Sequence, residues 1–292
     1  MASLKALRQR IRSVTNTRQI TKAMKMVAAA KLRRSQDRAL ANRPYSTQMG
    51  QMVQALAARV DKASAPPLLG GRSATQKRVR LVVFTADRGL CGSFNSSAIR
   101  AVRSRVAELQ AAGAEVTLTC VGRKGNDVLK RQFEEIIRRV HIGVGRNLTF
   151  AKAEEIARHL LHDFDQEGFD ACFIVYNAFV SAMTQTLTWR QIIPVPEQEE
   201  GAPTLASPPT CEPEEEEILA RLLPHNVAVQ IFRAMVESDA SENGARMTAM
   251  DNAVRNAGGM LRRLRITYNR TRQAAITTEL MEIISGSESL KG

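Results

Sequence analysis

The stretch "MTAMDNAVRNAGGMLRRLRITYNRTRQAAITT", residues 247–278, carries the pattern that decides the fold. Residues able to pack against another helix recur in it at alternating spacings of three and four: Met247, Met250, Val254, Ala257, Leu261, Leu264, Tyr268, Thr271, Ala275 and Thr278. This spacing is typical of a coiled-coil seam. Because the seam residues become small and polar toward the C-terminus, we expect the helix to lose its partner there and continue alone.

The other end of the chain, residues 1–60, supplies a second helix with a similar pattern. Apolar residues recur in it, with a shift of register after the first four: Leu4, Leu7, Ile11 and Val14, then Ile20, Met24 and Val27. Pro44 predicts a kink or break near Asn42–Pro44. Helices at opposite ends of a chain can pair if the middle returns the chain to its start, so we expect an antiparallel coiled coil.

Residues 77–200 have a different pattern, with β-branched runs that alternate with helical stretches. Four strands are predicted at residues 79–86, 115–122, 169–180 and 184–195, and a helix is predicted over residues 123–140. Such alternation is typical of a small Rossmann-like α/β domain. An acidic, proline-rich stretch follows, and a second long helix is expected over residues 212–286, with Pro224 as a possible start or kink. The predicted fold class is therefore α/β with long helices.

The positive charge of the chain is concentrated at its N-terminus. The whole chain has a formal net charge of +13, and residues 1–60 hold thirteen Lys and Arg against a single acid, Asp37. Three interpretations are open: a solvated surface, a nucleic-acid interface, or a surface for an acidic protein partner. Tyr45 is the one aromatic residue of this segment and the cations surround a packing seam, which disfavours nucleic acid.

Motifs for catalysis or cofactor binding are weak. The glycine-rich "DRGLCGS", Asp87–Ser93, lacks the ending of a phosphate-binding loop, so a strand-to-helix turn is favoured. His159 and His162 stand near Asp163 without an evident third ligand, which favours a solvated helix face over a metal site, and His141 and His225 are isolated. The four cysteines form no CxxC pair and indicate reduced thiols. The sequence offers no nucleophile–base pair and no convincing pair of catalytic carboxylates, and we expect no cofactor or metal.

Three motifs are similar to those of the γ subunit of F-type ATP synthases: "LRQRIRSVTNTRQITKAMKMVAAAKLRRSQ", "DRGLCGSFN" and "ARMTAMDNAVRNAGGMLRRLRITYNRTRQAAITTELMEIISG". The order of long helix, α/β domain and long helix also resembles that family. The resemblance implies a rotor without catalytic residues, which turns inside a ring of α and β subunits and couples proton-driven c-ring rotation to ATP synthesis. Its implied partners are the α and β subunits, the ε subunit and the c-ring.

The resemblance further implies one copy per complex, no homo-oligomer and no nucleic acid. No apolar run reaches the roughly 18 residues of a membrane helix, and the N-terminus lacks the apolar core of a secretory signal. We therefore expect no direct membrane insertion. The implied location is peripheral, at the cytoplasmic face of the cell inner membrane.

The resemblance also implies which residues meet the partners. Those expected to contact the α/β hexamer or to take part in coupling are Lys22, Met24, Lys25, Lys31, Arg33, Arg34, Arg246, Arg272, Gln273, Thr277 and Glu279. Glu212 is expected to face the c-ring, together with Cys211, which stands where many relatives have Tyr. Lys25 stands where some relatives have Glu.

Overall fold

The computed structural model describes residues 3–60, 65–71, 77–146, 148–196 and 215–289. The chain divides into two compact units. The first, here called the coiled-coil unit, comprises Met1–Val27 and Met247–Gly292; the second, here called the α/β unit, comprises Ala28–Arg246. Among the described helices, none has an apolar stretch suited to crossing a bilayer.

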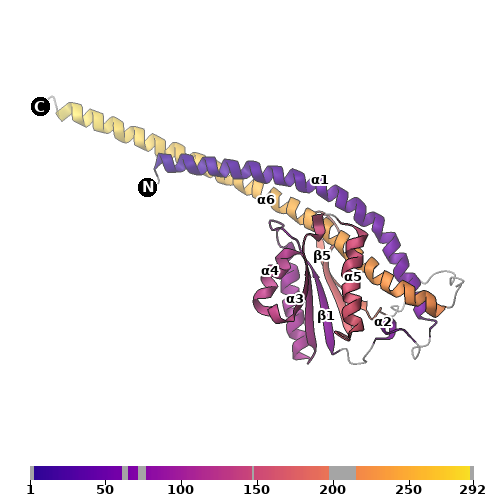
Figure 1. Ribbon diagram of the computed structural model, residues 1–292. Coiled ribbons are helices and arrows are strands. Elements are labelled where there is room, and N and C mark those ends of the chain that lie inside the picture. The colour runs from indigo at the N-terminus through magenta and orange to yellow at the C-terminus, as the bar shows by residue number, and fades with distance from the viewer. Residues whose placement is uncertain (1–2, 61–64, 72–76, 147, 197–214, 290–292) are drawn as a thin grey trace. The chain divides into compact units, whose positions relative to one another are not determined.

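Two long helices contribute to both units: α1 (Leu4–Ala57) and α6 (Glu215–Ser289). Within the coiled-coil unit they are antiparallel (Figure 1). Arg8 Nε donates to the Tyr268 hydroxyl at 2.8 Å, and Lys25 Nζ donates to Asp251 Oδ1 at 2.6 Å. The two residue numbers of each pair add to the same total, so the register of the helices stays constant between these contacts. The predicted antiparallel pairing is confirmed.

The tapering seam of α6 is confirmed within the coiled-coil unit. Met250, Ala257 and Leu261 are buried, and the other predicted seam positions as far as Ala275 are half-buried. From residue 276 to residue 287 every described side chain is exposed. The helix therefore continues without a partner among the described residues, as the shrinking seam residues predict.

The register shift predicted for α1 is wrong. Leu7 is buried and Leu4, Ile11 and Val14 are half-buried, but Ile20 and Val27 are 61% and 58% exposed. The spacing of three and four residues continues from Val14 without interruption, through positions occupied by Arg18, Thr21, Lys25, Ala28, Leu32 and Ser35. Because several of these residues are polar or small, an apolar pattern could not trace the seam through them.

Neither internal proline ends its helix. α1 continues through Pro44 and α6 continues through Pro224. Proline removes one backbone donor and its ring crowds the preceding turn, so the surrounding contacts must hold the helix. Next to Pro44, the buried Ser46 and the ion pair of Arg43 with Glu237 fix α1 against α6 within the α/β unit. Of the kink or break predicted near Asn42–Pro44, the break does not occur.

The α/β unit contains a five-stranded sheet in the order β3-β2-β1-β4-β5. All neighbours are parallel except β4 and β5, which are antiparallel. The strands are β1 (Arg78–Phe84), β2 (Glu115–Val121), β3 (Ile137–His141), β4 (Ala171–Phe179) and β5 (Gln185–Ile193). The four predicted strands are confirmed, and β3 was missed because its residues were assigned to the preceding helix.

Helices cover both faces of the sheet (Figure 1). The longer helices are α3 (Phe94–Ala111), α4 (Arg123–Phe133) and α5 (Phe150–Asp165), and the short ones are α2 (Pro67–Gly70), η1 (Glu134–Ile136) and η2 (Val144–Arg146). One core lies between the sheet and α3 with α4. The other lies between the sheet, α5 and the N-terminal part of α6. The end of α1 packs on the beginning of α6 through Met49, Val53, Leu56, Leu219 and Leu223.

Candidate interaction surface

The cations that α1 contributes to the predicted interface differ in how freely they are presented. Lys22, in the coiled-coil unit, is exposed, as are Lys31, Arg33 and Arg34 in the α/β unit. All four residues lie on α1, and Lys22, Arg33 and Arg34 form no ion pair with any acidic residue that the structure describes. Burial raises the pKa of the half-buried Asp239 carboxylate of α6, and the charge of Lys31 is among the causes that oppose this shift. Each of these exposed cations is therefore available to an acidic partner.

Lys25 is already paired within the chain. Its Nζ lies 2.6 Å from Asp251 Oδ1, and the other carboxylate oxygen of Asp251 lies 2.8 Å from Arg255. The Lys25 hydrogen bond is the largest cause that holds the pKa of Asp251 below its usual range. Met24, the neighbouring coupling candidate, is half-buried. Lys25 therefore links α1 to α6 in the coiled-coil unit through an ion pair, and Asp251 compensates its positive charge.

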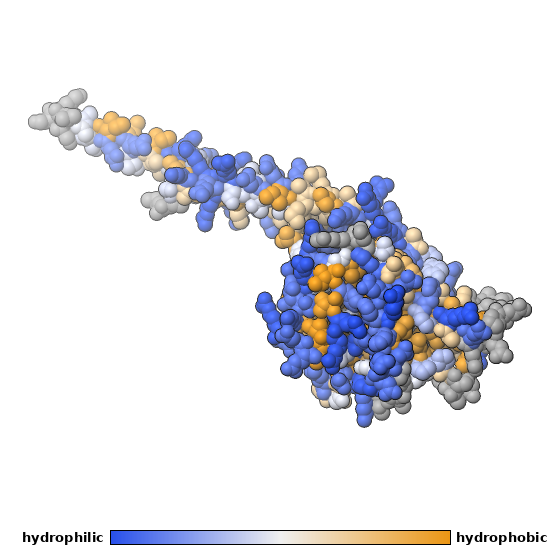
Figure 2. All heavy atoms as spheres, in the orientation of Figure 1, coloured by the Kyte–Doolittle hydropathy of each residue, from blue (hydrophilic) through white to orange (hydrophobic). Residues whose placement is uncertain are grey.

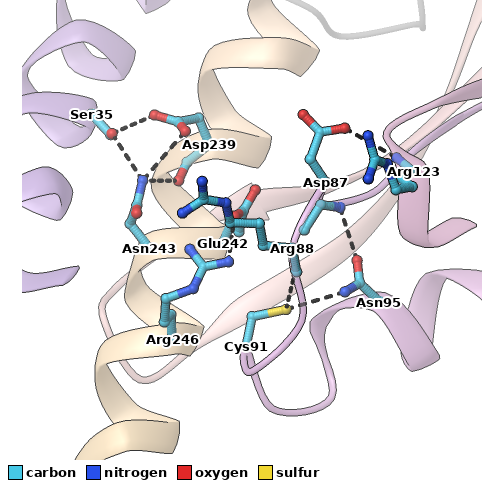
Figure 3. A network of polar contacts seen from close by, with 11 residues as sticks. Ser35, Asp87, Arg88, Cys91, Asn95, Arg123, Asp239, Glu242, Asn243 and Arg246 are labelled. Atoms are coloured by element: carbon cyan, nitrogen blue, oxygen red, sulfur yellow. Dashed lines mark hydrogen bonds and ion pairs between the residues drawn. The ribbon is translucent and has the colours of Figure 1, made fainter. Parts of the chain in front are cut away.

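Arg246 lies in a polar network of the α/β unit (Figure 3). Its Nη2 donates to Glu242 Oε1, one turn earlier on α6, at 2.5 Å, and its side chain is 14% exposed. Burial raises the pKa of Glu242, and the neighbouring Arg246 opposes that shift. Close by on α6, Asp239 accepts a hydrogen bond from Ser35 Oγ of α1 at 2.5 Å, and Asn243 Nδ2 donates to the same hydroxyl at 3.3 Å.

The Asp87–Ser93 turn lies beside Arg246 and joins β1 to α3, as the strand-to-helix interpretation predicts (Figure 3). Ala86, Cys91 and Phe94 pack with Ala245 of α6. Asn95 Oδ1 accepts from the Ala86 amide at 2.8 Å, and Asn95 Nδ2 donates to Cys91 Sγ at 3.2 Å. The turn therefore connects the sheet to α6 by packing against Ala245.

The unpaired end of α6 carries four of the predicted contact residues. Arg272, Gln273, Thr277 and Glu279 are all exposed. Around them, large apolar side chains are also exposed, at 48% to 71%: Ile276, Leu280, Met281, Ile283 and Ile284. Figure 2 shows these apolar residues as orange patches near the C-terminal end of the helix. An exposed apolar group of this extent is typical of a surface that a partner covers.

Cys211 and Glu212, the predicted c-ring contacts, lie outside the described residues. The remaining cysteines, Cys91, Cys120 and Cys172, are free and buried. Burial raises the pKa of Cys120 and of Cys172 to about 12. These three thiols are therefore suited to packing and unsuited to nucleophilic or redox chemistry.

Two features of the α/β unit escaped sequence reasoning. His141 is not isolated, because its ring stacks on that of His159 with the ring centroids 5.6 Å apart. Arg43 of α1, which is half-buried, forms a joint with the buried Glu237 of α6 and the backbone of Phe179. The first could be found only once β3 was recognised as a strand. The second stands one residue from a seam position and could have been suspected from the heptad spacing.

Sequence comparison relates the whole chain to known proteins. The sequence model of the family described as ATP synthase matches residues 3–290. An ATP synthase gamma chain of Magnetococcus marinus is 58% identical over 294 residues, which cover 100% of both chains. An ATP synthase gamma chain of Rhodospirillum rubrum is 52% identical over 306 residues, with 99% of this chain and 100% of that one covered.

Solved structures give a similar fold. A chain from the central stalk and c-ring structure of the Tetrahymena thermophila mitochondrial ATP synthase has a TM-score of 0.61 and 29% identity, and 80% of this chain and 99% of that one are covered. A chain from the Euglena gracilis mitochondrial ATP synthase, in its OSCP/F1/c-ring structure, has a TM-score of 0.72 and 23% identity. The match covers 98% of this chain and 94% of that one.

Proposed function

The chain belongs to the family of ATP synthase gamma chains, and we propose that its two long helices form the rotor shaft that transmits torque between a c-ring and the catalytic α/β hexamer. In this role the chain performs no bond-making chemistry of its own. It couples proton-driven rotation to ATP synthesis, and ATP hydrolysis to the reverse rotation. The hexamer, the ε subunit and the c-ring are its partners, and one copy serves each complex.

The observation that carries the proposal is the unpaired end of α6 in the coiled-coil unit. At the constant register of the two helices, Leu4 stands opposite Arg272, so α6 continues alone for about 17 residues or roughly 26 Å. Five large apolar side chains are exposed there, and no part of the chain that the structure describes covers them. We infer that the apolar inner wall of the hexamer covers this end and acts as its bearing.

The exposed cations of α1 supply a different kind of contact. Lys22, Lys31, Arg33 and Arg34 can attract acidic loops of the β subunits through charge, without a deep apolar contact that would have to be broken at every step. Met24 and Lys25 lie on the same helix, but they are partly covered by α6. We propose that they act by holding the two helices in register while the free cations meet the partner.

Asymmetry makes the shaft a transmitter of rotation. In the coiled-coil unit α1 covers only one side of α6, and past Leu4 only α6 remains. Each β subunit would therefore meet a different surface as the shaft turns. Differential contacts of this kind shift the conformational equilibrium of each catalytic site in turn. Arg272, Gln273, Thr277 and Glu279 are the proposed polar contacts near the end of the shaft.

We further propose that the chain is organised as an N-terminal coiled-coil helix (1–60), an α/β foot (77–200) and a C-terminal coiled-coil helix (212–286). Arg246 would act in coupling by holding α6 against the Asp87–Ser93 turn of the foot, since its ion pair with Glu242 leaves it little exposed. Glu212 and Cys211 would face the c-ring. The chain would then lie peripherally at the cytoplasmic face of the inner membrane and bind no nucleic acid.

The test is truncation of the unpaired end in the reconstituted enzyme. Removal of residues 283–292 should leave one copy of the chain per hexamer but lower the torque measured by single-molecule rotation. Removal of residues 290–292 alone is the matched control and should leave torque unchanged. Full torque after the longer deletion would contradict the bearing role of this end, and failure of the intact chain to co-purify with a hexamer would contradict the assignment as a whole.

A further inference from the structure

We propose that His141, Glu155 and His159 form a binding site in the α/β unit for a divalent transition-metal ion of the Zn²⁺ type. His141 is the last residue of β3, while Glu155 and His159 lie on α5. One ligand atom from each of the three residues lies within 4.8 Å of the others. Elements that are separate in the sequence thus bring the donors of one site together.

The spacing on α5 suits a metal. Glu155 and His159 are four residues apart, so their side chains project from the same face of the helix, one turn from each other. The ring of His141 lies over that of His159, with centroids 5.6 Å apart and an interplanar angle of 25°. Ligands around a tetrahedral Zn²⁺ are separated by about 3.4 Å. The ligand atoms, which lie within 4.8 Å of one another, must come closer through rotation of the side chains, and Glu155 is exposed to solvent.

Each of the two histidines has one ring nitrogen that forms no hydrogen bond with the described residues. His141 Nε2 and His159 Nδ1 are buried atoms with no hydrogen-bond partner in the described part of the chain. Buried polar atoms in folded proteins are normally paired, so two such atoms in contacting rings suggest a ligand.

The cationic neighbours of the cluster do not prevent binding. Arg139, two residues before His141 on β3, donates to Asp163 Oδ1 at 2.9 Å, so much of its charge is compensated there. Lys152 donates to the Gly143 carbonyl at 3.3 Å. Two imidazoles and one carboxylate would carry the metal, and water would complete its coordination because Glu155 faces solvent.

The consequence of such a site is mechanical. β3 is an edge strand, paired on one side only, with β2. A metal that joins its last residue to α5 would fasten this edge to the helix that covers one face of the sheet. The ion would therefore stabilise the α/β unit by binding the folded state alone.

The test uses the full-length chain, purified without a histidine tag. Titration with Zn²⁺ by isothermal calorimetry should show one site, and Zn²⁺ should raise the thermal unfolding temperature. His141→Gln and His159→Gln should weaken binding by about 30-fold or more and abolish the temperature shift. Glu155→Gln should weaken it about tenfold, and because that side chain is exposed the variant is also the safeguard if a histidine variant fails to fold.

Matched controls lie on the same helix. His162→Gln removes an exposed histidine one turn beyond His159, and Glu154→Gln removes the acid next to Glu155; both should bind Zn²⁺ like the unaltered chain. Co²⁺ as a probe should give visible absorption bands without the charge-transfer bands of thiolate ligands. Equal Zn²⁺ affinity in His159→Gln and in His162→Gln would overturn the proposal, and so would thiolate bands with Co²⁺. The absence of binding at 100 μM Zn²⁺ would also overturn it, because that concentration is roughly the upper limit for a site built from three protein ligands.

Discussion

The guanidinium of Arg43 on α1 is paired with the carboxylate of Glu237 on α6 through two hydrogen bonds, from Nε at 2.6 Å and from Nη2 at 2.9 Å. The same carboxylate accepts from the backbone amide of Phe179 at 2.8 Å, and Arg43 Nη2 donates to the Phe179 carbonyl at 2.6 Å. Three elements of the α/β unit, α1, α6 and β4, therefore meet in one cluster of charge-assisted hydrogen bonds.

Removal of Arg43 should be costly because Glu237 is only 4% exposed. Arg43→Ala leaves that carboxylate buried without its partner, and we expect the free energy of unfolding to fall by about 3 kcal/mol, with the partial exposure of Arg43 limiting the loss. Urea unfolding followed by circular dichroism measures the difference. Arg105→Ala is the control, since Arg105 and Glu108 form an exposed pair whose loss should cost about 0.5 kcal/mol or less. Equal losses in the two variants would refute the joint.

The next prediction concerns Gly122, between β2 and α4. Its φ is +106°, and a Cβ placed on it would lie 2.0 Å from the backbone oxygen of Thr85. Backbone cannot move aside as a flexible side chain can, so Gly122→Ala should lower the free energy of unfolding by about 3 kcal/mol or more. Gly113→Ala separates the two causes, because Gly113 has φ +80° but open space around it. It should cost about 1 kcal/mol.

The sequence predicted the pairing of the terminal helices because a seam of regular spacing requires a partner of similar length. It failed where the seam is polar. Between Val14 and Leu32 the positions facing α6 are occupied by Arg18, Thr21, Lys25 and Ala28, and their contacts are mostly not apolar. Lys25 donates a hydrogen bond to Asp251 of α6, Thr21 donates to the carbonyl of Arg18, and Arg18 approaches Gly258 of α6. Ile20 and Val27 attract attention as apolar residues, yet they face outward.

The strand β3 shows a second physical limit. It is five residues long and alternates between half-buried and exposed side chains at the edge of the sheet, so its sequence "IRRVH" carries little apolar signal. Its pairing with β2 is a tertiary effect. The metal-site candidate depended on that strand: His141 could not be brought to His159 while residues 137–141 were assigned to a helix. Arg33, by contrast, is predicted to contact the hexamer and is exposed on α1, and that exposure required only the helical assignment.

Acid should destabilise the α/β unit through Asp170. Its carboxylate accepts from Arg78 Nη2 at 2.7 Å and from the Arg78 amide at 2.9 Å. The side-chain hydrogen bond with Arg78 is the largest cause that lowers the pKa of Asp170 from its ordinary 3.8. A lowered folded-state pKa gives stability that is complete above 3.8 and is lost as the pH falls through the folded value.

Between pH 7 and pH 2 the free energy of unfolding should therefore fall more steeply for the unaltered chain than for Asp170→Asn, which lacks this titration. At pH 7 the variant should be less stable by about 2 kcal/mol, because Arg78 loses the charged partner that the buried Asp170 provides and a neutral amide accepts weaker hydrogen bonds. Asp127→Asn, at an exposed position, is the matched change and should keep the acid dependence of the unaltered chain. Identical pH profiles for Asp170→Asn and the unaltered chain would contradict this account.

Charge reversal tests the exposed cations of α1. Arg33 is exposed and has no described acidic partner, so Arg33→Glu should leave the chain folded but repel an acidic loop of the hexamer. We expect the rate of coupled ATP synthesis in reconstituted vesicles to fall about two- to fivefold, and more steeply at low salt than at high salt. Arg131→Glu, an exposed arginine at the end of α4, is the control and should have no effect. A loss independent of salt would point away from charge steering.

The seam of the coiled-coil unit can be tested by two substitutions on neighbouring turns of α6, Leu261→Ala and Ile266→Ala. Leu261 is 5% exposed and Ile266 is 63% exposed. Leu261→Ala should cost about 2 to 4 kcal/mol of local stability, because the cavity lies where α1 and α6 meet, whereas Ile266→Ala removes surface that is already in water and should cost less than about 0.5 kcal/mol.

Hydrogen exchange is the measurement suited to this unit, since a stretch of α1 that loses its packing against α6 unwinds more readily, and its backbone amides exchange through that local opening. Leu261→Ala should accelerate exchange over residues 4–27, and Ile266→Ala should not. On α1 the same comparison separates the observed seam from the apolar pattern of the sequence: Leu7→Ala should accelerate exchange, while Ile20→Ala should leave it unchanged because Ile20 faces solvent. Faster exchange in Ile20→Ala would mean that α1 pairs with α6 in the shifted register after all.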